Sequence, residues 1–239
     1  MKDTSMLTGL RGIAALIVFV SHCANEGLLP GFMGNGLGQI GVVIFFVLSG
    51  FLMAYLYLDK GFDVHSVGRY IQARVARVVP LYLAIIILSF VISNSVYPDF
   101  HYSITDPKIL VRAFLFIDAP YEFWTIPVEM QFYGVFILFW FLYQLGVKKI
   151  LLATFIVLTA VPSVIYLFLK GGTLVLFSTY SCAFFTGVIT AILYDKIVSS
   201  PACRLFAKYS PVPLIILFVL NMPGLRFDYG WVLSDNLFA

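Results

Sequence analysis

The sequence predicts an all-α membrane protein, a polytopic bundle of about seven transmembrane helices whose N-terminus lies on the cytoplasmic side. Of the 239 residues, 61% are hydrophobic and only 11% are charged, whereas a soluble domain needs roughly a quarter charged residues to cover its surface. Apolar windows of spanning length recur along the chain, and the basic residues gather between alternate windows. We therefore expect one domain over residues 1–239, multi-pass in the cell (inner, cytoplasmic) membrane.

The expected spans follow from the apolar windows, most of them close to the roughly 20 residues that a spanning helix needs. We expect the first window to be a retained helix and not a cleavable signal peptide, because Arg11 interrupts its apolar run and no small-residue cleavage site follows. The segment Lys108–Asp118 is apolar but too short to span, so it lies at the interface or re-enters the membrane. In order, the windows are Gly9–Ala24, Leu37–Leu58, Val78–Tyr97, Phe123–Leu145, Ile150–Leu169, Leu174–Tyr194 and a short one from Val212 to about Leu225.

The distribution of Lys and Arg sets the orientation, because cytoplasmic loops of membrane proteins are enriched in both. With the N-terminus inside, four basic residues fall on the outer side, namely Lys108, Arg112, Lys170 and Arg226. Eleven fall on the inner side: Lys2, Arg11, Lys60, Arg69, Arg74, Arg77, Lys148, Lys149, Lys196, Arg204 and Lys208. The net charge of +3 is too small to indicate a nucleic-acid partner, and three isolated cysteines give no metal-binding spacing.

Arg11 and His22 are the first candidate functional residues, because ionisable groups inside a bilayer are costly. They are eleven residues apart, so on a helix they differ by only about 20° around the axis and by about 16 Å in depth. A cation and a base on one face could line a single channel. The alternative is that Arg11 anchors the inner end and His22 lies at the outer interface.

Arg74 and Arg77 are the second candidates, in a basic stretch just before the third window. At a spacing of three residues they share a helix face, and a guanidinium matches phosphate oxygens with two parallel hydrogen bonds. They are candidates for a phosphate clamp, with a simple topology anchor as the alternative.

Glu129 is the third candidate, about two turns below the outer end of the fourth window. A carboxylate at that depth must pair with another group or take up a proton. Its expected depth is similar to that of His22, the single histidine within a predicted span.

Four short segments, taken in order, resemble the membrane-bound acyltransferase family 3, whose members are integral-membrane O-acyltransferases. The segments are Leu10–His22, with the spacing Arg-x10-His; Gly41–Leu52; Arg74–Tyr82, with Arg-x-x-Arg and Arg-x-x-Pro; and Trp124–Tyr133, which contains Glu129. Val43 departs from the pattern, since many members carry a polar residue there. The family also has more spans than this chain supplies, so we expect the fold to be incomplete at the C-terminal end.

The resemblance implies transfer of an acyl group, acetyl-CoA being the expected donor, to a hydroxyl of an extracytoplasmic glycan or lipid-linked glycan. Arg74 and Arg77 would bind the CoA phosphates and Arg11 would guide the donor into the bundle. His22 would be the general base, with a covalent acyl-histidine as the less favoured variant. Glu129 would orient His22 or stabilise its protonated form. No metal is expected.

Two other functional classes remain open from the sequence. A transporter or flippase could use the buried Arg, His and Glu as a relay, although the sequence contains no inverted repeat of the kind that many transporters show. A non-catalytic fragment or assembly partner is the other alternative.

Overall fold

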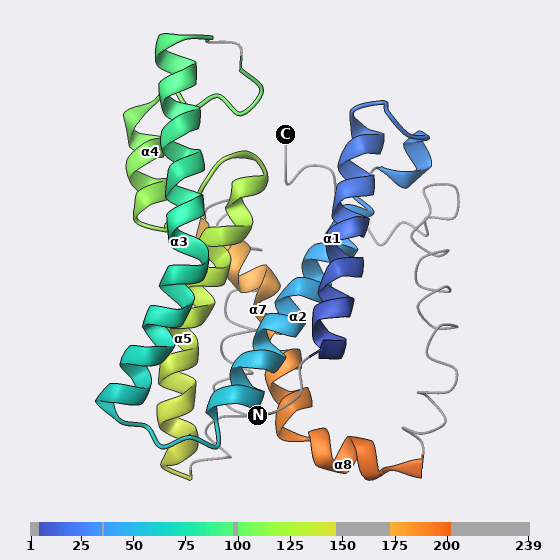
Figure 1. Ribbon diagram of the computed structural model, residues 1–239, viewed down its shortest axis with the longest axis vertical. Coiled ribbons are helices and arrows are strands. Elements are labelled where there is room, and N and C mark those ends of the chain that lie inside the picture. The colour runs from blue at the N-terminus through green and yellow to red at the C-terminus, as the bar shows by residue number, and fades with distance from the viewer. Residues whose placement is uncertain (1–4, 35, 98–99, 147–172, 202–239) are drawn as a thin grey trace. The chain divides into compact units, whose positions relative to one another are not determined.

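All regular elements that the structure describes are helices, as the sequence predicts. The structure is a computed structural model that describes residues 5–34, 36–97, 100–146 and 173–201. The helices are α1 (Ser5–Asn25), η1 (Gly31–Met33), α2 (Gly38–Tyr57), α3 (Val64–Ser95), α4 (Pro107–Phe114), η2 (Tyr121–Trp124), α5 (Thr125–Gln144), α7 (Thr173–Ile192) and α8 (Tyr194–Ser199) (Figure 1).

Four helices of the described residues, α1, α2, α3 and α5, are long and apolar enough to cross a membrane, and α7 contributes a shorter apolar segment. The predicted first, second, fourth and sixth windows agree with α1, α2, α5 and α7 to within a few residues. The windows Ile150–Leu169 and Val212 to about Leu225 lie outside the described residues. The third window, Val78–Tyr97, is the exception, because α3 begins fourteen residues earlier, at Val64.

The chain divides into two compact units. The first comprises residues 1–49 and 189–239, and the second residues 50–188. In the first unit, α1 packs closely on the start of α2 through small residues. A Cβ added at Gly41 would lie 2.6 Å from the carbonyl oxygen of Ala14, and one at Gly38 would lie 3.2 Å from the side chain of Ser21. Small residues at such a seam let two membrane helices approach closely.

The second unit has an aromatic core between α5 and α7. Phe132 stacks on Phe184 with ring centroids 4.1 Å apart, and Phe136 and Trp140 are fully buried. Gly50, in the part of α2 that belongs to this unit, leaves no room for a side chain, because a Cβ there would overlap the carbonyl group of Phe184. The core therefore fixes α5, which carries Glu129.

Helix α3 is 32 residues long and buries different faces along its length. In residues 64–77, which we call the basic half, the buried residues are Ser66 and Tyr70. In residues 80–95, the apolar half, they are Tyr82, Ile86, Ser89 and Ser93. At 100° per residue, the two buried faces are about 150° apart around the axis. The basic half contacts α5 through Tyr70, whereas the apolar half contacts α4 and also the start of α5 at Ile126.

Helix α4 runs back along the apolar half of α3 (Figure 1). At one end, the backbone N–H of Ile104 donates to Ser93 Oγ at 3.1 Å, and at the other the Tyr82 hydroxyl donates to the carbonyl oxygen of Ala113 at 3.1 Å. Ser93 and Tyr82 are eleven residues apart on α3, or about 16 Å. Both expected placements for Lys108–Asp118, at the interface or re-entering the membrane, are compatible with this return along α3.

Candidate active site

The predicted site residues fall in both units. Arg11 and His22 lie on α1, in the first unit, and Arg74, Arg77 and Glu129 lie in the second. The expected pairing of His22 with Glu129 stays a prediction.

Helix α1 is continuous from Ser5 to Asn25, so Arg11 and His22 are on one helix with the spacing that the sequence predicts. Both side chains are half-buried. The buried residues Ala14 and Ser21, which line the contact with α2, lie about a quarter turn away from them around the axis. The small residues at this contact therefore hold the face that carries Arg11 and His22 in a fixed orientation relative to α2.

Arg74 is half-buried beside two tyrosine rings of the second unit. Its guanidinium carbon lies 5.8 Å from the centroid of the Tyr133 ring and 6.0 Å from that of Tyr57. Its Nε is buried and has no hydrogen-bond partner among the described residues. A planar, delocalised cation can lie against two aromatic faces, which the compact ammonium of lysine does less well. Arg74 is thus a cation held in place by its surroundings rather than a solvated anchor.

Tyr133 joins Arg74 to Glu129. Its hydroxyl donates to Glu129 Oε1 at 2.5 Å, one helical turn away on α5, while its ring lies against Arg74. Tyr133 is itself tied to α3, because the Tyr70 hydroxyl donates to its carbonyl oxygen at 3.1 Å. From the sequence, Arg74 was expected at the inner end of one span and Glu129 near the outer end of the next. The structure brings both into one cluster.

Arg77 lies one turn further along α3 and is exposed. The predicted shared helix face is compatible with the helix geometry, but the environments of the two arginines differ. Arg74 is enclosed by tyrosine rings, whereas Arg77 is accessible.

Lys60 and Tyr57 belong to the same region, and sequence reasoning missed them. Lys60 Nζ lies 4.6 Å from the centroid of the Tyr57 ring. Its backbone is held by α5, because Trp140 Nε1 donates to the Lys60 carbonyl oxygen at 3.1 Å and Gln144 Nε2 donates to the same oxygen at 3.0 Å. The sequence indicates only that Lys60 is a basic residue on the inner side. Its proximity to Arg74 depends on the way that α2, α3 and α5 pack.

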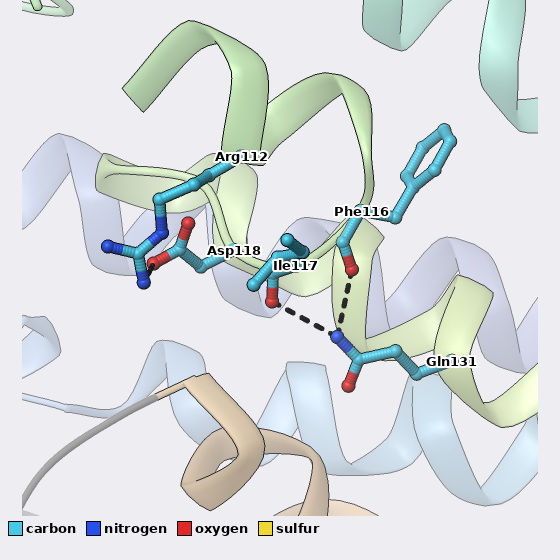
Figure 2. Close-up of polar contacts among 5 residues, drawn as sticks. All are labelled: Arg112, Phe116, Ile117, Asp118 and Gln131. Atoms are coloured by element: carbon cyan, nitrogen blue, oxygen red, sulfur yellow. Dashed lines mark hydrogen bonds and ion pairs between the residues drawn. The ribbon is translucent and has the colours of Figure 1, made fainter. Parts of the chain in front are cut away.

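A second polar cluster connects α5 to the turn that follows α4 (Figure 2). Gln131 Nε2 donates to the carbonyl oxygens of Phe116, at 2.9 Å, and Ile117, at 3.1 Å. An ion pair of 2.5 Å between Arg112 and Asp118 closes the same turn. Phe116 has a positive φ of 52°, which is uncommon for a residue with a side chain. These contacts fasten the turn after α4 to α5 at Gln131, two residues beyond Glu129.

Apolar spanning helices with a half-buried arginine, a carboxylate and a tyrosine in one cluster define an integral-membrane protein with a polar site built between its helices. The family comparison makes this specific. The model of the acyltransferase domain family (Acyl_transf_3) matches residues 6–238, and the chain belongs to this family. The resemblance expected from the four sequence segments is thus confirmed.

Two curated relatives match shorter stretches. The chain is 38% identical over 93 residues to the acyltransferase MdmB of Streptomyces mycarofaciens, which covers 36% of this chain and 23% of that protein. It is 31% identical over 130 residues to protein 2 in the picA locus of Rhizobium radiobacter, covering 48% of this chain and 65% of that protein. The matched stretches therefore span less than two thirds of either relative. No solved structure matches the chain significantly.

Proposed function

We propose that the chain transfers an acyl group, acetyl in the first instance, from cytoplasmic acyl-CoA to a hydroxyl on the far side of the cell membrane. The acceptor class is a surface glycan or lipid-linked glycan. Membership of the acyltransferase family supports the reaction type. The observation that carries the donor assignment is the Arg74 guanidinium, held against Tyr57 and Tyr133 with Arg77 exposed one turn away. Two arginines so arranged suit the phosphates of a CoA ester.

The proposed chemistry is a direct transfer. His22 accepts the proton of the acceptor hydroxyl while that oxygen attacks the thioester carbonyl. Collapse of the tetrahedral intermediate breaks the carbon–sulfur bond, and the CoA thiolate leaves and takes up the proton from His22. Arg11, on the same face of α1, guides the acyl-pantetheine arm toward His22. Glu129 stabilises the protonated His22 in this scheme.

The test separates the donor site from the base. In the purified protein, His22→Ala should abolish acyl transfer and leave binding of radiolabelled acetyl-CoA within a few-fold of wild type. Arg77→Ala should weaken acetyl-CoA binding roughly tenfold or more, because it removes a charge-assisted hydrogen bond to phosphate. Arg77→Lys should recover only part of this affinity.

Near-normal turnover of His22→Ala would eliminate His22 as the base. Unchanged affinity in both Arg77 variants would leave Arg77 as a topology anchor. A transporter would bind no acetyl-CoA at this site, so absence of binding by the wild type would overturn the proposal as a whole.

A further inference from the structure

We propose that Lys60 is a further donor-binding residue that recognises the 3′-phosphate at the ribose end of the CoA nucleotide. This inference rests on the proposed function and assigns a specific part of the donor to a residue outside the predicted site. Its basis is that Lys60 and Arg74 lie against the same aromatic ring, that of Tyr57.

The position of Lys60 is fixed by its backbone. Two donors from the end of α5, Trp140 Nε1 and Gln144 Nε2, share its carbonyl oxygen, and Gln144 Nε2 also lies 2.6 Å from the carbonyl oxygen of Leu58. A lysine that serves only as a topology anchor needs no such support, because any exposed position on the inner side suffices. Here the loop is held so that the Lys60 stem passes over Tyr57.

Arg74 and Lys60 differ in exposure, which suits the two ends of a long phosphorylated ligand. Arg74 is half-buried and its guanidinium is held beside Tyr57 and Tyr133, whereas Lys60 is exposed. A donor whose acyl arm enters the helix bundle leaves its nucleotide at the exposed end of this cluster. An exposed ammonium, a compact charge on a flexible stem, suits a terminal phosphate monoester. The arginines, with their rigid fork, suit the diphosphate.

Of the two acidic residues next to Lys60 in the sequence, Asp59 and Asp63, the second is held by other contacts. Asp63 lies in the same loop, but its carboxylate accepts hydrogen bonds from the Ser66 backbone N–H at 3.0 Å and from Ser66 Oγ at 2.7 Å. Both bonds orient Asp63 toward the start of α3. Lys60 thus keeps its place over Tyr57, where an incoming phosphate meets it.

The experiment compares the affinities of CoA and 3′-dephospho-CoA for the purified full chain at low ionic strength. The wild type should bind CoA roughly tenfold more tightly than dephospho-CoA, the worth of one charge-assisted contact. Lys60→Met keeps an unbranched stem over Tyr57 and should lose this preference, with the affinity for dephospho-CoA unchanged. Lys60→Arg should keep most of the preference.

Arg69→Met is the matched control, because it removes an exposed cation on the basic half of α3. It should leave the ratio of the two affinities unchanged. An equal loss of preference in Arg69→Met would show that diffuse surface charge is responsible and would overturn the inference. A preference retained in Lys60→Met would overturn it as well, while leaving the donor proposal intact. If the wild type bound neither ligand, the proposed function itself would fail and this inference with it.

Discussion

The two halves of α3 belong to one continuous helix, but they differ in their packing partners and in the side chains they expose. The apolar half buries Tyr82 and Ile86 against α4 and leaves large apolar side chains such as Leu81 and Leu88 exposed, at 67% and 57%. The basic half buries Tyr70 against α5 and exposes the charged side chains of Arg69 and Arg77, together with apolar ones such as Ile71. One half therefore presents a surface suited to lipid, and the other carries the cationic part of the candidate site.

Helix length explains why one helix can hold both environments. At 1.5 Å per residue, 32 residues extend for about 48 Å, whereas the hydrocarbon core of a bilayer is about 30 Å thick. The usual tilt of about 20° shortens the helix only slightly. Part of α3 must therefore extend beyond the hydrocarbon.

The largest effect is expected on the free energy of unfolding, from a change in the apolar half. It tests whether this half contributes to stability alone. Ile86 is fully buried in the cluster between α3 and α4, so Ile86→Ala should destabilise the protein by about 2 kcal/mol or more through the cavity it leaves. Acetyl-CoA affinity should stay at the wild-type value. Unfolding in detergent micelles measures the first quantity and equilibrium binding the second.

Leu88→Ala is the control for that experiment, because this exposed position on the same half should change stability by no more than about 0.5 kcal/mol. A loss of donor affinity in Ile86→Ala, at a temperature where the protein is folded, would break the division between the halves.

The next largest effect is expected from removing the hydroxyl of Tyr133, on α5 next to the basic half of α3. Tyr133→Phe keeps the ring that lies against Arg74 but removes the hydrogen bond to Glu129. A hydrogen bond to a charged group contributes about 1.5–3 kcal/mol, so we expect acyl transfer to fall tenfold or more. Donor affinity should change little, which a split between kcat and the dissociation constant would show. Equal losses in both quantities would mean that Tyr133 acts only through Arg74.

Removing a tyrosine hydroxyl from the apolar half of α3 should lower stability and leave turnover unchanged. Tyr82→Phe removes the hydrogen bond to the carbonyl oxygen of Ala113, which should cost about 1 kcal/mol of stability. Turnover of the folded enzyme should equal that of the wild type. A fall in turnover comparable to that of Tyr133→Phe would show that α4 and the turn after it take part in the reaction.

The sequence predicts the class of fold because composition and window length depend on the bilayer rather than on packing. Because an apolar window follows hydropathy and not helix boundaries, it places the start of α3 too late. Arg69, Arg74 and Arg77 lower the hydropathy of a window without ending a helix, so the window begins only at Val78, whereas the helix begins at its cap, Asp63.

The candidate site was predictable in part. Arg74 and Glu129 are visible as charges in or beside apolar segments, but their connection through Tyr133 depends on how α3 and α5 pack. Lys60 and Tyr57 carry no sequence signal, since a lysine after a span and a tyrosine at its end are ordinary at membrane interfaces. Contacts between helices far apart in the sequence could not be derived from spacing alone.

The smallest expected effect concerns the caps that begin the two packed helices. Asp63 caps α3, and the hydrogen bonds from the side chain and backbone of Ser66 hold the pKa of its carboxyl below its ordinary value of 3.8. Because the folded pKa is the lower one, Asp63 contributes stability above its ordinary pKa and loses that contribution as the pH falls through the folded value. Asp63→Ala should therefore lower the unfolding temperature slightly at neutral pH, and the difference from wild type should narrow below about pH 4. Asp63→Ser, which can still cap the helix, should retain much of the wild-type stability without the acid dependence. A difference from wild type that grows on acidification would refute the assigned role of Asp63.

Asp106→Ala is the matching change at α4, where Asp106 accepts from the Lys108 backbone N–H at 2.8 Å. If the two halves are independent, Asp106→Ala should lower stability and leave acetyl-CoA affinity unchanged.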